Sequence, residues 1–557
     1  MSAETSRPPL NWWRSAVVYQ VYVRSFADSD GDGIGDLDGV RSRLPYLRSL
    51  GVDGLWLTPF YPSPLHDYGY DVSDYRGVHP DYGTLDSFDR LVRDAHRLDL
   101  KVIVDVVPNH CSIEHPWFRA ALAAGPGSPE RDRFHFAEGR NEHSADGQGD
   151  EPPNNWRSIF GGSAWQRVPD GQWYLHTFSA EQPDFNWRHP EVSSYFEEVL
   201  RFWLDRGVDG LRIDVAHGLH KAEGLPDHEH ADHDELTGDP INPHAWNQPE
   251  VHDVWRGWRA VAEEYTQRTG RERVLVGEVG VLDTHQLAQY QRPDELHQTF
   301  FFEFLRAAWD EPSLYGVIER GLRTIAGSGS SVAWVLNNHD MPRSVTRYAG
   351  GAPGAGPGDL DLGLDRARAA ALLMLALPGS AYLYQGEELG LPEVTDLPDH
   401  VLTDPMFHRT GGVRRGRDGC RVPLPWTADH DVFGFSPDGS AGTTWLPQPG
   451  WFAEHAVDRM LDRGDSMLHL YREALALRRR LPALRSDDFR WLPTEPGVLA
   501  FTRGDGFACV VNCSPKPVCN PVDGPLLLAS DAAVLDGAGE KLPPNTAAWV
   551  LLEAAAP

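Results

Sequence analysis

Short apolar runs rich in valine, isoleucine and aromatic residues alternate with stretches of helical periodicity along most of the 557-residue chain. This alternation is typical of parallel strands joined by helical crossovers. Eight strands are predicted, at 17–26, 54–60, 101–108, 210–216, 273–279, 298–304, 332–337 and 380–385. Helices are expected between them, at stretches such as 37–49, 85–98, 190–206 and 366–377. Because eight such strands fit a closed barrel, we expect an α/β fold of the (β/α)8 TIM-barrel type.

Two stretches break this regular spacing. Residues 109–180 are rich in glycine, proline and asparagine, and they are too long for a simple loop after the third strand, so we expect an inserted domain. A second polar insertion, 386–465, follows the eighth strand. The tail, 484–557, changes to short strand patterns and is predicted to fold as a C-terminal antiparallel β-domain. The barrel would then comprise residues 1–108 and 181–483.

The charge balance excludes one class of partner. Lysine and arginine number 51 against 81 aspartates and glutamates, which gives a formal charge of −30 at pH 7. Binding to nucleic acid or anionic membranes depends on clustered basic residues, and no basic stripe is found.

The N-terminus has no secretory pattern, and the most apolar stretch, 369–384, is interrupted by Pro378 and Gly379. Five thinly spread cysteines do not resemble a secreted disulfide framework, so a soluble cytoplasmic protein with buried or idle thiols is expected.

Three carboxylates end predicted barrel strands, namely Asp214, Glu278 and Asp340. In barrels of this type, catalytic groups lie at the C-terminal ends of the strands. Burial and neighbouring charges can separate the pKa values of an acid and a nucleophile there, as glycoside hydrolysis with retention requires. Any one of these residues could be an ordinary charge at the start of a loop. Three at strand ends, with Arg212 and His339 beside them, favour a site that cleaves glycosides.

Four sequence blocks resemble those of a known family. Asp105–His110 (DVVPNH), Gly210–His217 (GLRIDVAH), Gly277–Val279 (GEV) and Asn337–Asp340 (NNHD) are similar, in order, to the four blocks of the α-amylase family, glycoside hydrolase family 13. The resemblance covers nearly the whole chain. Stretches such as GLWLTPFYPSP, SIFGGSAW and YQGEELG resemble the subgroup of oligo-1,6-glucosidases and exo-acting α-glucosidases more than endo-amylases.

The resemblance implies a role for each matched residue. Asp214 is expected to be the nucleophile, Glu278 the general acid and base, and Asp340 the stabiliser of the transition state. The expected substrate-binding residues are Asp67, Tyr70, His110, Phe160, Arg212, His339 and Arg421. Among these, Arg212 would hold Asp214 ionised, and Tyr70 would give the sugar ring a stacking platform. Asp67 and Arg421 would close the far end of the pocket around a terminal glucose.

A calcium site is also implied. The stretch Asp28–Asp36 (DSDGDGIGD) alternates carboxylates with glycines, a pattern that can surround a hard cation with oxygen atoms. It differs from an EF-hand, because Gly39 stands where that loop places a bidentate glutamate. Members of the resembled subgroup carry Ca²⁺ in this loop, which implies a structural ion outside the pocket, with no organic cofactor. The implied ligands are Asp28, Asp30, Asp32, Ile34 and Asp36. Another polar run, 227–234, lacks regular ligand spacing and is interpreted as a solvated loop.

These residues together predict an α-glucosidase that releases glucose from the non-reducing ends of short oligosaccharides or disaccharides, with retention; the oligomeric state is left open. In the resembled subgroup, Val after the nucleophile is typical of α-1,6-acting enzymes, and Val215 stands there, but Ala216 and His217 depart from the pattern that follows. Oligo-1,6-glucosidase is therefore the first alternative. A transglucosylase, sucrose isomerase or trehalose-forming mutase would share the first half-reaction. A non-catalytic binding homologue is a remote alternative, because all three carboxylates are present.

Overall fold

Eight parallel strands close into a barrel, in the order β1-β11-β10-β9-β8-β7-β3-β2. They are β1 (Val17–Val21), β2 (Gly54–Leu57), β3 (Lys101–Val106), β7 (Gly210–Ile213), β8 (Val274–Gly277), β9 (Gln298–Phe301), β10 (Ala333–Val335) and β11 (Ser380–Tyr384). The computed structural model describes residues 11–140, 151–229, 242–281, 283–350, 358–440, 442–536 and 540–552. All eight predicted strands are present, and the predicted barrel is confirmed.

All eight strands end earlier than the sequence predicts. β7 ends at Ile213 and β8 at Gly277, so Asp214 and Glu278 stand just beyond the hydrogen-bonded ladder. The prediction of a strand running to Phe304 is wrong, because residues 302–306 form helix α8 directly after β9. Residues released from the ladder form the loops at the mouth of the barrel, where such folds carry their functional groups.

Helices connect the strands and enclose the barrel. They are α1 (Leu37–Ser42), α2 (Leu44–Leu50), α3 (Leu85–Arg97), α5 (Pro190–Asp205), α6 (Val251–Thr269), α7 (Thr284–Gln289), α8 (Phe302–Arg306), α9 (Glu311–Thr324), α10 (Ser344–Tyr348) and α11 (Leu360–Ala376). The single helix expected over 37–49 is wrong, because Pro45 starts a second helix at its first turn. Inside the barrel, Val18, Trp56 and Phe300 belong to one buried cluster, so the interior is a packed core and not a pore.

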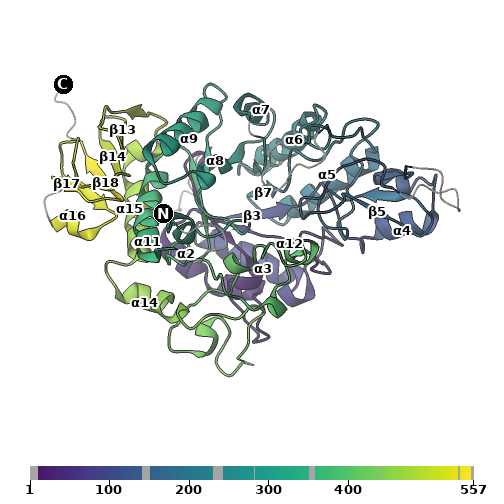
Figure 1. Cartoon of the computed structure of the whole chain (residues 1–557), viewed down its shortest axis with the longest axis horizontal. Helices are drawn as coiled ribbons and strands as arrows, with labels where there is room; N and C mark the ends of the chain where they lie inside the picture. Colours follow the sequence, from purple (N-terminus) through teal and green to yellow (C-terminus); the bar gives the residue numbers. More distant parts are fainter. Residues whose placement is uncertain are drawn as a thin grey trace, which may run out of the picture.

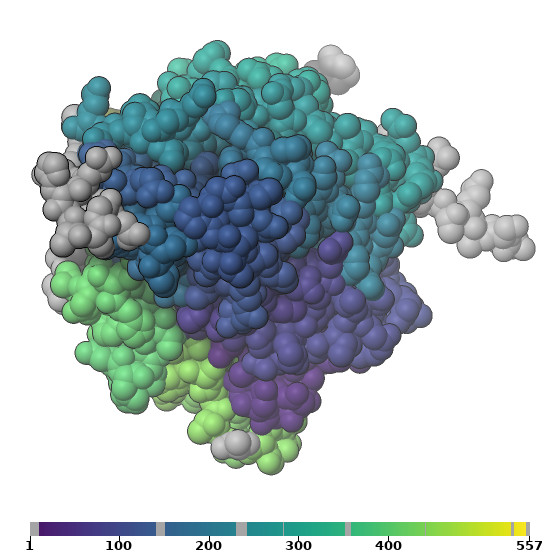
Figure 2. All heavy atoms as spheres, turned by 90° about the vertical axis from the view of Figure 1, so that its right-hand side faces the viewer, coloured from purple at the N-terminus to yellow at the C-terminus, as the bar shows by residue number. Residues whose placement is uncertain are grey.

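The chain between β3 and α5 forms a small insertion. It contains helix α4 (Pro116–Ala124) and an antiparallel sheet of β4 (Phe136–Ala137), β6 (Trp173–Leu175) and β5 (Trp165–Arg167). Figure 1 shows it at the end of the molecule opposite the C-terminal sheet. Seen from that end, the insertion, in blue, lies over the middle of the face, between N-terminal segments in purple and teal segments of the later chain (Figure 2).

The chain after β11 leads into the C-terminal sheet. It passes through α12 (Pro405–Arg409), α13 (Phe452–His455), α14 (Val457–Asp462) and α15 (Met467–Arg480). The main sheet has the order β12-β13-β14-β18-β16, and β15 pairs with β17. Their bounds are β12 (Arg490–Trp491), β13 (Val498–Arg503), β14 (Phe507–Asn512), β15 (Val518–Cys519), β16 (Leu526–Ala529), β17 (Lys541–Leu542) and β18 (Thr546–Leu551), with α16 at Ala532–Asp536. The strands of both sheets are antiparallel, and Trp549 of β18 donates to the carbonyl of Leu372 in α11 (3.1 Å), which confirms the predicted C-terminal β-domain and joins it to the barrel.

Two features of the described residues concern membranes and disulfides. Among the described residues, no helix has both the length and the apolar character needed to cross a membrane. All five cysteines lie in described parts of the chain and are free thiols, three of them buried. The cytoplasmic location inferred from cysteine usage stays a prediction.

Candidate active site

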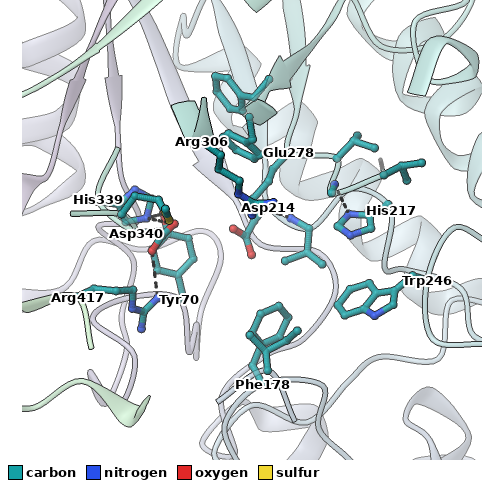
Figure 3. Close-up of a pocket in the computed structure, with 18 of the residues that line it drawn as sticks. Tyr70, Phe178, Asp214, His217, Trp246, Glu278, Arg306, His339, Asp340 and Arg417 are labelled. Atoms are coloured by element: carbon teal, nitrogen blue, oxygen red, sulfur yellow. Dashed lines mark hydrogen bonds and ion pairs between the residues drawn. The ribbon is translucent and has the colours of Figure 1, made fainter. Parts of the chain in front are cut away.

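A cavity of about 280 Å³ opens at the C-terminal ends of the barrel strands, close to the lower limit of roughly 300 Å³ for small-molecule pockets. The three expected catalytic carboxylates line it together, although they come from loops after β7, β8 and β10. Five of the expected substrate-binding residues line it too: Asp67, Tyr70, His110, Phe160 and His339. Figure 3 shows Asp214 at the centre, with His339, Asp340 and Arg417 on one side.

Arg212 lies beneath the cavity and bridges its carboxylates. The residue is in β7, two positions before Asp214, so both side chains leave the same face of the strand. Its Nη1 donates to Asp214 (2.6 Å) and to both oxygens of Asp105 in β3 (2.9 and 3.0 Å). Its Nη2 donates to Glu278. The guanidinium is 2% exposed, so it acts with little screening by water.

The backbone after Asp214 adopts an unusual conformation. Val215 has φ +46°, a left-handed value that is costly for a β-branched residue. The amide of Gly218 donates to the carbonyl of Val215 (2.9 Å) and closes a tight turn. The amide of Asp214 donates to the carbonyl of Val106 (2.9 Å), which keeps that residue anchored to the barrel. The turn therefore fixes where the Asp214 carboxylate stands.

Burial and crowding raise the pKa values of Asp105 and Asp214 beside Arg212. Burial has the largest effect on Asp105, and although Arg212 opposes it, the pKa rises to about 7. Burial also raises the pKa of Asp214 well above its usual range, and repulsion by Glu278 and Asp105 adds to the rise against the pull of Arg212. One guanidinium faces three carboxylates here, so its attraction does not outweigh burial at Asp105 and Asp214.

A second group of charges closes one end of the cavity. Arg417 donates through Nη2 to Asp67 (2.7 Å), through Nη1 to Asp340 (3.1 Å) and through Nε to Asp404 (2.6 Å). Burial would raise the pKa of Asp340, but His339 and the two arginines Arg417 and Arg421 outweigh it and hold that pKa well below its usual value. Asp340 therefore presents an ionised acceptor to the cavity.

His339 and Tyr70 form the adjoining wall. Gln20 donates to Nδ1 of His339 (2.6 Å), so the neutral ring carries its proton on Nε2, which lies 2.7 Å from the Tyr70 hydroxyl. Burial lowers the pKa of His339 to about 3, so the ring is neutral at physiological pH. The two rings are nearly parallel, with centroids 5.4 Å apart.

The sequence analysis expected Arg421 to close the far end of the pocket with Asp67, but the arginine that lines the cavity and contacts Asp67 is Arg417. Arg421 is 1% exposed and lies behind the cavity wall, where it donates to the carbonyl of His339 (2.8 Å) and to Asp340 (3.0 Å). Both arginines belong to the same stretch, RDGCR, four positions apart. The amide of Arg417 also donates to Asp404 (2.9 Å), a contact that the sequence alone does not reveal.

The insertion supplies the remaining wall. His110 is buried, and its Nε2 lies 3.1 Å from Nε2 of Gln182, which also donates to Asp67 (3.1 Å). The Phe160 ring packs under the Arg417 guanidinium, with 4.9 Å between the centroid and Cζ. Lys221, which the sequence did not single out, forms a fully buried ion pair with Asp184 (2.9 Å) and so joins the loop after β7 to the insertion.

The acidic loop lies away from the cavity and brings three of its carboxylates together. Oxygens of Asp28, Asp30 and Asp36 all lie within 4.8 Å of one another, and this group does not include Asp32. Gly33 has φ +87°, and a Cβ there would lie 2.3 Å from the carbonyl of Thr443, so the turn requires glycine. Three oxygen donors around a small space suit a hard cation such as Ca²⁺.

The polar run at 227–234 is only partly described. Asp227 accepts a hydrogen bond from the amide of Asn155 (3.0 Å) and pairs with Arg140, so it ties a loop to the insertion. Residues 230–234 lie outside the described residues.

Comparisons with known proteins agree with this architecture. The family model for the alpha amylase catalytic domain matches residues 20–487. A "Probable alpha-glucosidase" of Rhizobium meliloti is 38% identical, over 91% of this chain and 90% of that protein. An "Oligo-1,6-glucosidase" of Parageobacillus thermoglucosidasius is 34% identical, over 84% of each. The crystal structure of an alpha-glucosyl transfer enzyme has a TM-score of 0.81 and 35% identity, covering 97% of this chain and 99% of that one.

Proposed function

Because the chain belongs to the α-amylase family of glycoside hydrolases, we propose that it is a retaining, exo-acting α-glucosidase that releases single glucose units from short α-glucosides. The observation that carries this proposal is the closed end of the cavity. Arg417 joins Asp67 to Asp340 across it, and Phe160 packs against the same guanidinium. A sugar ring whose non-reducing side faces this group would meet protein there, so the terminal glucose would be the one removed.

The first half-reaction uses Asp214 and Glu278. The Asp214 carboxylate attacks C1 of the bound glucose while the bond from C1 to the glycosidic oxygen breaks. Glu278 gives its proton to that oxygen, and a β-glucosyl ester on Asp214 results. The shared contact with Arg212 supports this assignment, because it holds both carboxylates at one place in the cavity.

The second half-reaction returns both residues to their starting state. Glu278, now ionised, takes a proton from water, and the water oxygen attacks C1 as the ester bond to Asp214 breaks. The product is α-glucose. Asp340 accepts hydrogen bonds from sugar hydroxyls and brings its negative charge beside the positive charge that develops on the ring, and His110 and His339 line the cavity near it.

Transfer of glucose to another sugar is the second candidate. The similarity to an alpha-glucosyl transfer enzyme over nearly the whole chain favours it, since a sugar hydroxyl can replace water in the second step. Val215 and the similarity to an oligo-1,6-glucosidase keep α-1,6-linked substrates as the first alternative for hydrolysis. The oligomeric state is left open.

We also propose that the acidic loop holds a structural Ca²⁺. Asp28, Asp30 and Asp36 would supply carboxylate oxygens, with the carbonyl of Ile34 as a further ligand. Bound there, the ion would fix the loop against Ser440 and Thr443 and take no part in the reaction, because none of these residues lines the cavity. No organic cofactor is required by the reaction above.

Proton NMR on the purified enzyme with maltose, isomaltose, sucrose and trehalose tests the proposal. The α-anomer of glucose should appear first and equilibrate to the β-anomer later. Early β-glucose would contradict a retaining enzyme, and mainly rearranged disaccharide at low substrate concentration would favour the transferase. The substrate that is consumed fastest identifies the preferred linkage.

A further inference from the structure

The wall of the cavity opposite Arg417 is built by two stacked rings. His217 and Trp246 both come from the long loop after β7, and their centroids lie 4.8 Å apart with planes 21° from parallel. Figure 3 shows them on the other side of Asp214 from Tyr70 and Arg417. If the terminal glucose binds at the closed end, the leaving group meets this wall.

His217 also joins two loops. The amide of Gly280, two residues after Glu278, donates to Nδ1 of His217 (3.3 Å). Next to it, the amide of Ala216 donates to the carbonyl of Glu278 (2.8 Å). A Cβ at Gly280 would lie 3.0 Å from Nε2 of His217, which is closer than side chains normally approach, so the ring packs directly against the backbone. The loop that carries Glu278 therefore rests on the loop that carries Asp214.

The protonation state of His217 suits this contact. Burial lowers its pKa to about 4, and a neutral ring with Nδ1 as acceptor carries its proton on Nε2. The hydrogen bond from Gly280 is therefore available throughout the neutral range.

We infer that His217 is a positioning residue for Glu278, and that with Trp246 it forms the surface met by the leaving group. The inference rests on the proposed role of Glu278 as the acid. Arg212 holds the carboxylate of Glu278, whereas its backbone is held by Ala216 and, through Gly280, by His217. Displacing the acid by about 1 Å can lower the rate about 100-fold. Holding the loop that carries Glu278 in place should therefore keep the reaction fast.

The inference is tested by comparing how far kcat/KM falls for substrates with different leaving groups. A disaccharide needs full protonation of its departing oxygen, whereas p-nitrophenolate leaves with little help. In His217→Ala, kcat/KM should fall by about 100-fold for the preferred disaccharide and by less than tenfold for p-nitrophenyl α-glucoside. His217→Asn, whose side-chain oxygen can accept from Gly280, should recover part of the loss. Equal losses on both substrates in both variants would overturn the inference.

The packing of His217 on Gly280 allows an independent test. Gly280→Ala should lower kcat/KM for the disaccharide at least tenfold, because its Cβ meets the imidazole. Added to His217→Ala, the same change should cost less than twofold, since the ring is gone. Additive losses would overturn the inference. His285→Ala, an exposed histidine of α7 that does not line the cavity, is the control and should leave both substrates unchanged. If the wild-type enzyme hydrolyses no α-glucoside, the proposed function fails instead.

Discussion

Two groups of charges at the cavity use the same residue types in different proportions. The one at the strand ends sets three carboxylates against one guanidinium, namely Asp105, Asp214 and Glu278 around Arg212. The one at the closed end sets three against two, namely Asp67, Asp340 and Asp404 around Arg417 and Arg421. We call them the Arg212 cluster and the Arg417 cluster.

The difference lies in what happens to protons. In the Arg212 cluster, burial prevails and raises the pKa of Asp105 to about 7 and that of Asp214 as well. In the Arg417 cluster, the arginines outweigh burial at Asp340 and Asp404 and lower both pKa values, while burial still raises the pKa of Asp67. In the cluster short of cations, burial prevails and favours the protonated forms of Asp105 and Asp214. A better balanced one keeps ionised acceptors for sugar hydroxyls.

The largest expected effect separates chemistry from binding. Asp214→Ala removes the proposed nucleophile, so kcat should fall by roughly 10⁴-fold or more while the melting temperature stays near that of the wild type. Azide is small enough to occupy the vacated space, and it should restore turnover by attacking C1 to give β-glucosyl azide. Activity near the wild-type level, or α-glucosyl azide as the product, would remove Asp214 from this role.

A matched pair of variants tests the Arg417 cluster. Arg417→Lys keeps the charge but loses the fork that joins Asp67 to Asp340, so the inhibition constant for glucose should rise about tenfold. Arg421→Lys should leave that constant within about twofold, because Arg421 does not line the cavity. Inhibition assays with glucose at fixed substrate concentration compare them. A larger effect at Arg421 would restore the assignment made from the sequence.

Much of the fold could be predicted because strand and helix periodicities are local. The eight strands follow from short apolar runs, and the C-terminal sheet follows from the change to short strand patterns. Strand ends could not be predicted, because apolar residues such as Val215 and Phe302 continue the pattern after the ladder stops. Only the left-handed turn at Val215 and the helix at Phe302 end those strands.

In the site, too, only the features that depend on local sequence could be predicted. The catalytic carboxylates could be predicted because motifs mark them, and Asp214 and Glu278 follow their strands directly, whereas Asp340 lies five positions after the end of β10. Arg417 and Lys221 could not, because their meaning depends on partners far away in the chain. Arg417 contacts Asp67, 350 positions away, and Lys221 pairs with Asp184 of another loop. Choosing between Arg417 and Arg421 required knowing which one faces the cavity.

The two clusters should also differ in how pH affects stability. Asp105 has a raised pKa of about 7 against about 3.9 when unfolded, so its contribution to the free energy of unfolding falls as pH rises from about 4 to 7. Asp340 has a lowered pKa, so its contribution is present above about pH 4 and is lost at lower pH. The free energy of unfolding is measured by urea titration at pH 4.5 and at pH 7.5. The decrease between these two pH values should be smaller in Asp105→Asn than in the wild type, and unchanged in Asp340→Asn. An unchanged fall in Asp105→Asn would contradict the assigned pKa.

The smallest expected effect concerns the acidic loop, which lies outside both clusters. Excess chelator should lower the melting temperature by about 2–5 °C and leave the initial rate at moderate temperature unchanged, because the proposed Ca²⁺ binds the folded chain alone and does not reach the cavity. Asp30→Asn should abolish this response to Ca²⁺, since Asp30 belongs to the converging group. Asp32→Asn should keep it, since Asp32 stands outside that group although the sequence pattern treats the two alike. If Asp32→Asn loses the response to Ca²⁺ and Asp30→Asn keeps it, the ion sits elsewhere in the loop. If chelator leaves the melting curve of the wild type unchanged, the result argues against an exchangeable ion.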